Sequence, residues 1–180
     1  MKNAFVSIGV VAIAATFGDW IWATFLSRHL MAAGLIHGAL LCLAMGAMVG
    51  RPTGRAAAGA AAGVGIGLAA AGLFYLLAPI MRYGAMFVAW FALWVLLAAL
   101  YHRLGGGTSL RLAIARGVIA GAASGLAFYL ISDMWTRWNP QAINYLEHFA
   151  RWTFAFAPGF LVLQGGTRQA RVSGPRSVNI

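Results

Sequence analysis

The sequence predicts an all-α, polytopic membrane protein: a bundle of six transmembrane helices with close, glycine-mediated helix packing. Three observations predict this fold class. Of the 180 residues, 62% are hydrophobic and only 9% are charged, whereas about a quarter of a soluble domain is charged. Six apolar stretches each approach the roughly 20 residues that a helix needs to cross a bilayer. Glycines recur at four-residue spacing in two of these stretches, which favours close approach of neighbouring helices.

Turn-forming residues separate the apolar stretches. Residues 50–55 and 102–109 are rich in glycine and arginine, and Asn139 with Pro140 provides an N-cap and a first helical residue for the last stretch. The predicted helices cover residues 4–26, 30–50, 56–79, 83–101, 112–132 and 142–164. We therefore expect one domain, residues 1–166, followed by a basic cytoplasmic tail, residues 167–180.

The first stretch also has features of a secretory signal peptide. Lys2 provides a positive start, and an apolar segment with small residues follows it. However, the apolar character continues through Trp22 to Leu26, which makes the stretch long enough to span. We therefore interpret it as the first transmembrane helix.

The charge distribution predicts the orientation of the chain. The net charge of +10 does not indicate nucleic acid as a partner, because the basic residues lie mainly between and after the apolar stretches. Nine of them fall on the side of the two termini and four on the other. By the positive-inside rule, both termini lie in the cytoplasm, in a bilayer of the bacterial inner-membrane type. The single cysteine, Cys42, excludes a disulfide within the chain.

Two glycine strips predict where helices approach closely. Each strip places three glycines at positions i, i+4 and i+8, along one face of a helix. We expect the two helices to pack on each other or on a neighbour through these helix-packing residues: Gly59, Gly63 and Gly67, and Gly117, Gly121 and Gly125.

Polar side chains on four helices are predicted to lie at one depth. Asp19 precedes the end of the first helix by seven residues, and His37 follows the start of the second by seven. At 1.5 Å per residue, both lie about 10 Å from the turn that joins these helices. Trp90 and the segment 147–151 lie at similar depths in helices four and six. A buried carboxylate needs a partner, and His37 and Arg151 are the two best placed for Asp19.

This layer is the candidate ligand site. We expect a pocket open to the outer side. The carboxylates, histidines and arginine of the layer would be its polar groups, and the tryptophans would form its apolar walls. The candidate ligand-binding residues are Asp19, Trp20, Trp22, His37, Trp90, Glu147, His148, Arg151 and Trp152. The alternative is that the polar groups form an ion-pair network that only fixes helix register. Glu147 and Arg151, four residues apart, can also pair along their own helix.

Three functions are compatible with this pattern. The first is binding, or help in translocation, of a small-molecule ligand, with no catalytic residues and no identified cofactor. The second is a non-catalytic accessory subunit of a larger membrane complex, with other membrane-protein subunits and the lipid bilayer as partners. The third is a metal- or haem-dependent membrane enzyme, for which Asp19, His37, Glu147 and His148 would be ligands, although no HExxH or cysteine-containing haem motif is present.

The chain length and the expected membrane topology resemble those of one group of transport proteins. The substrate-binding membrane subunits of energy-coupling-factor vitamin transporters are also small six-helix proteins. The resemblance is architectural, because no motif carries it, and it implies no site residues in this chain. It implies recognition of a small molecule by the bundle itself.

Overall fold

The computed structural model describes residues 2–107, 109–131 and 143–165, and these form an α-helical bundle. Its helices are α1 (Lys2–Ile21), α2 (Leu30–Gly50), α3 (Ala56–Met81), α4 (Gly84–Arg103), α5 (Leu110–Ile131) and α7 (Tyr145–Gly165). A π-helical segment, η1 (Trp22–Leu26), extends α1, and a 3₁₀ turn, η2 (Arg51–Thr53), follows α2. When η1 is counted with α1, the helix ends lie within three residues of those predicted. The predicted N-cap at Asn139, the following Pro140 and the tail lie outside the described residues.

Within the described residues, five helices are long and apolar enough to cross a membrane: α1 with η1, α2 with η2, α3, α4 and α5. The remaining helix, α7, is of similar length but is less hydrophobic than these five. It packs against α1 and α5. Many large apolar residues on the outside of the bundle are exposed, as expected for a protein whose solvent is lipid.

Glycines bring α2 and α3 into backbone contact. A Cβ atom added to Gly63 would overlap the carbonyl oxygen of Cys42, and one added to Gly67 would overlap that of Gly38. In α5, Gly117 and Gly121 pack instead on α4: a Cβ atom added to Gly117 would lie 2.8 Å from Val95 Cα, and one added to Gly121 would lie 3.0 Å from the ring of Phe91. Both strips therefore pack on the preceding helix of the chain rather than on each other.

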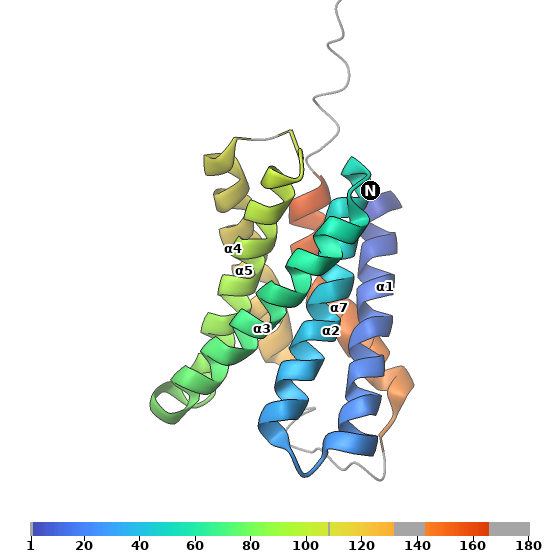
Figure 1. The fold of residues 1–180 in the computed structure, drawn as a ribbon, viewed down its shortest axis with the longest axis vertical. Helices are drawn as coiled ribbons and strands as arrows, with labels where there is room; N and C mark the ends of the chain where they lie inside the picture. The colour runs from blue at the N-terminus through green and yellow to red at the C-terminus, as the bar shows by residue number, and fades with distance from the viewer. Residues whose placement is uncertain (1, 108, 132–142, 166–180) are drawn as a thin grey trace, which may run out of the picture.

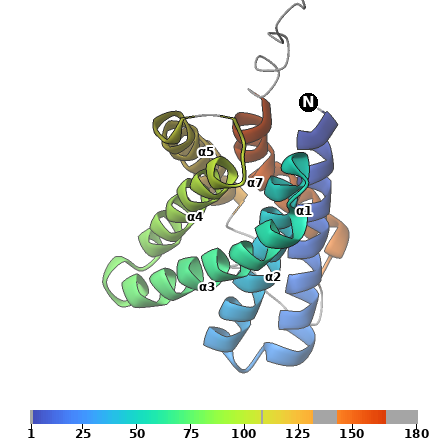
Figure 2. The ribbon, with the colours of Figure 1, turned by 45° about the horizontal axis from the view of Figure 1, so that its top comes forward.

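The contact between α2 and α3 ends near Gly38. Towards the α1–α2 turn the two helices diverge, so that the α3–α4 turn lies well apart from the α1–α2 turn (Figures 1 and 2). At Gly34 the space between the helices is occupied by the side chain of Tyr75, whose hydroxyl donates a hydrogen bond of 2.6 Å to the carbonyl of Leu30. The termini of the described chain lie at the opposite, closed end of this wedge (Figure 1).

The core lies between α4, α7 and the first two helices. Trp94, Phe156 and Phe160 are among its largest fully buried side chains. The indole of Trp94 covers Gly159, next to Pro158 in α7, and a Cβ atom at Gly159 would overlap that ring. This core fills the closed end of the bundle and leaves the wedge between α2 and α3 less completely packed.

Candidate functional site

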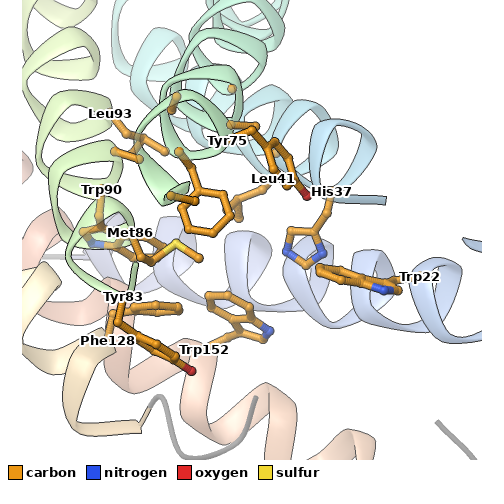
Figure 3. A pocket seen from close by; sticks show the side chains of 18 of the residues that line it. Trp22, His37, Leu41, Tyr75, Tyr83, Met86, Trp90, Leu93, Phe128 and Trp152 are labelled. Carbon is orange, nitrogen blue, oxygen red and sulfur yellow. The ribbon is translucent and has the colours of Figure 1, made fainter. Parts of the chain in front are cut away.

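A cavity of about 440 Å³ occupies the wedge. α2, α3 and α4 supply most of its walls, and single residues of η1, α5 and α7 complete it. The walls are almost entirely apolar and aromatic. In Figure 3, His37 and Trp22 lie on one side of the cavity, Trp90, Met86 and Phe128 lie on the other, and Tyr75 lies between α2 and α3.

Stacked aromatic rings form one wall of the cavity. The ring of Trp90 stacks on that of Phe128 with centroids 4.4 Å apart, and Trp152 lies nearly parallel to Trp90 at 6.3 Å. Phe156 stacks on both indoles from the core side. Because these rings are buried and mutually packed, they present a preformed flat surface rather than one that must order on binding.

Asp19 lies directly behind this wall. Its side chain is fully buried, at 0% exposure. The carboxylate oxygen Oδ2 accepts a hydrogen bond of 2.7 Å from the indole N–H of Trp152 and lies 2.8 Å from Nδ1 of His148. Residues 148 and 152 are four apart, so both side chains project from the same face of α7. The desolvation cost of the buried carboxylate is thus offset by two donors on one helix.

His37 faces the other carboxylate oxygen. Its Nδ1 lies 3.5 Å from Asp19 Oδ1, which is too long for a good hydrogen bond. Both ring nitrogens of His37 are buried and have no hydrogen-bond partner in the structure. The ring also lines the cavity. A buried polar group without a partner costs about 1–3 kcal/mol, and His37 is the cavity-lining histidine that carries this cost.

The structure brings together six of the nine candidate ligand-binding residues. Asp19, His148 and Trp152 form the buried cluster, and Trp22, His37, Trp90 and Trp152 line the cavity. Asp19, His37 and His148, which the depth count assigned to one layer, lie next to one another in the structure.

Three candidate residues face elsewhere. Trp20 is 39% exposed and stacks on Phe17, on the outer surface of α1. The side chains of Glu147 and Arg151 are 49% and 27% exposed, and they pair with each other at 2.5 Å, as their spacing predicted. The expectation that Arg151 is a partner of Asp19 was wrong. The reason is the rotation of α7, which directs His148 and Trp152 inwards and turns the adjacent face, about 100° around the helix, away from the cavity.

Sequence reasoning missed Ser124 and Tyr75. Ser124 is fully buried, accepts a hydrogen bond of 3.0 Å from the indole of Trp90 and donates one of 2.5 Å to the carbonyl of Ala155. It thereby connects α4, α5 and α7 behind the aromatic wall. Ser124 lies seven residues before the end of α5, and Tyr75 lies six before the end of α3. Counted from the predicted helix ends, 132 and 79, Ser124 lies eight residues in and Tyr75 only four, so the depth count that selected Asp19 could have selected Ser124 but not Tyr75.

The cluster is not arranged as a metal site. Asp19, His37 and His148 are close together, but both rings turn Nδ1 towards the carboxylate instead of towards a shared point. Accordingly, no group of three His, Cys, Asp or Glu side chains within residues 2–107, 109–131 and 143–165 could hold a metal ion. The chemistry that this arrangement supports is binding by an apolar surface and one histidine. Comparison of the chain with protein-family models, with curated proteins and with solved structures found no match in any of the three.

Proposed function

We propose that this protein binds a small, largely apolar molecule in the cavity between α2, α3 and α4, and that it holds or helps to translocate that molecule within a membrane. The observation that carries the proposal is the aromatic cavity with the unpartnered His37 in its wall. Its volume of about 440 Å³ is within the roughly 300–1,000 Å³ of small-molecule sites. Apolar walls with few polar groups are the usual composition of such sites.

The proposal includes an orientation. Most residues that line the cavity come from the halves of α2, α3 and α4 next to the α1–α2 and α3–α4 turns, away from the termini of the described chain, and the excess of basic residues is expected on the side of the termini. With the termini in the cytoplasm of a bacterial-type inner membrane, the cavity is in the outer leaflet half and receives its ligand from the outer side or from the lipid there.

The test is saturable binding of a small aromatic probe, 2-naphthol, to the protein in lipid nanodiscs. Ala78 of α3 lines the cavity, so Ala78→Trp should fill it and abolish saturable binding. Ala69 lies on the exposed face of the same helix, which makes Ala69→Trp the matched control that should bind as the wild type does. Equal binding by both variants, or by empty nanodiscs, would contradict the proposal.

A second function, that of an accessory subunit in a membrane complex, is favoured by a different observation. Only 11% of the apolar window of α3 is buried in the bundle, against 39% to 44% for the other four spanning helices. Leu76 and Ile80 are exposed on its outer face. A helix so little covered by its own chain has a surface available for another membrane protein. Co-purification of a stoichiometric partner in mild detergent would support this function, and its loss in a Leu76→Trp variant would place the interface on α3.

A further inference from the structure

The chemical class of the ligand is indicated by the hydrogen-bonding state of His37. The side chain is 9% exposed, its Nε2 atom is buried without a partner, and its ring lines the cavity. The rest of the wall offers mainly carbon. Among molecules of the same shape, the cavity therefore selects chiefly by the chemical group that faces Nε2 of His37.

Asp19 determines which hydrogen-bonding role Nε2 can play. The indole of Trp152 can only donate, so the Asp19 carboxylate acts as an acceptor at Oδ2. The facing nitrogen of His37, Nδ1, lies nearest to the second carboxylate oxygen at 3.5 Å. This distance is too long for a good hydrogen bond, but the negative carboxylate beside Nδ1 still favours the tautomer with hydrogen on Nδ1 over the one with a lone pair there. In the neutral ring this leaves Nε2 with a lone pair, so that it accepts a hydrogen bond and does not donate one.

The backbone of α1 and two indoles hold the His37 ring in this position. A Cβ atom at Gly18 would lie 2.8 Å from Nδ1, so the ring rests directly on α1. The indole of Trp152 lies 5.7 Å away, centroid to centroid, and that of Trp22 lies 6.3 Å away. The acceptor is thus held by packing, which is the arrangement that gives a hydrogen bond its selectivity.

We propose that the ligand is an uncharged, ring-containing molecule whose hydroxyl or ring N–H donates a hydrogen bond to His37 Nε2 while its ring stacks on the wall formed by Trp90, Phe128 and Trp152. This inference rests on the proposed function of the cavity. An ion is disfavoured, because the cavity has no buried counter-charge: Asp19 is already paired, and Arg82, which lines the cavity at the α3–α4 turn, is exposed.

Three bicyclic probes of similar size test the inference: 2-naphthol, which has a donor; 2-methylnaphthalene, which has none; and the N-methylquinolinium cation. Their dissociation constants are measured in nanodiscs for wild-type protein, for His37→Phe, which keeps a ring and removes Nε2, and for His29→Phe, a histidine outside the cavity. The quantity compared is the preference for 2-naphthol over 2-methylnaphthalene, because partition of each probe into lipid cancels between variants.

We expect the wild type and His29→Phe to prefer 2-naphthol, and His37→Phe to lose about two- to tenfold of that preference, the value of one net hydrogen bond. Gly18→Ala displaces the His37 ring without removing it and should lose part of the preference for 2-naphthol. This variant tests the inference even if His37→Phe does not fold. An unchanged preference in folded His37→Phe and Gly18→Ala, or tighter binding of N-methylquinolinium, would overturn the inference and leave the binding function intact. Absence of saturable binding by every probe would overturn both.

Discussion

Replacing Gly63 with alanine places a methyl group where the backbone of α2 already lies. The added carbon would overlap the carbonyl oxygen of Cys42 and would lie 3.2 Å from the Cα atom of Gly46. Both contacts are backbone atoms of a continuous helix, so no side chain can rotate away to relieve them. The two helices must separate, and the packing that holds the closed end of the wedge is lost.

Gly65, two residues further along α3, is the matched control. Nothing lies within 4 Å of a Cβ atom added there. Gly65→Ala therefore changes the same residue type in the same helix without touching α2, and it gains up to about 1 kcal/mol in helix propensity. Overpacking at Gly63 costs about 1–3 kcal/mol. Because both variants gain the same helix propensity, that gain cancels, and we expect them to differ by about 1–3 kcal/mol in the free energy of unfolding.

The measurement is reversible unfolding in mixed micelles of dodecyl maltoside and sodium dodecyl sulfate, followed by tryptophan fluorescence. A difference of about 2 kcal/mol changes the ratio of folded to unfolded protein roughly 30-fold, which separates the two midpoints clearly. Equal midpoints for Gly63→Ala and Gly65→Ala would refute the backbone contact between α2 and α3 as the origin of stability at this position.

Three further predictions follow from the described contacts. Asp19→Asn should destabilise the bundle by about 1–3 kcal/mol, because it disrupts a buried, charge-assisted pair. Arg151→Ala, which removes a partly exposed pair, should have a much smaller effect. The same unfolding assay measures both, and a larger effect of Arg151→Ala would contradict the prediction. Ser124→Ala leaves the buried indole of Trp90 without its hydrogen-bond acceptor and should lower the free energy of unfolding by about 1–3 kcal/mol. A shift of tryptophan emission should accompany this loss. An unchanged unfolding midpoint would refute a stabilising role of the hydrogen bond between Trp90 and Ser124. Because Cys42 is buried, Arg28→Cys at the α1–α2 turn should react in whole cells with a membrane-impermeant maleimide and Thr53→Cys in η2 should not; the reverse pattern would invert the proposed orientation.

The helices and their ends were determined by local sequence. The number of residues that a bilayer requires, and the glycines, prolines and arginines that interrupt the apolar stretches, gave boundaries that the structure reproduces closely. Depth was also accessible, because rise per residue is constant along a helix. This is why Asp19, His37, Trp90 and His148 could be assigned to one layer before any contact was known.

Rotation and tilt of the helices were decided only by tertiary packing. The hydrophobic pattern of a helix in lipid indicates its length far better than the direction of each face, since apolar side chains suit both lipid and core. The sequence therefore could not tell that α7 turns His148 rather than Arg151 towards Asp19. Likewise, the glycines of α3 indicated close packing, but only the divergence of α3 from α2 beyond Gly38 creates the cavity that Tyr75 and Phe128 help to line.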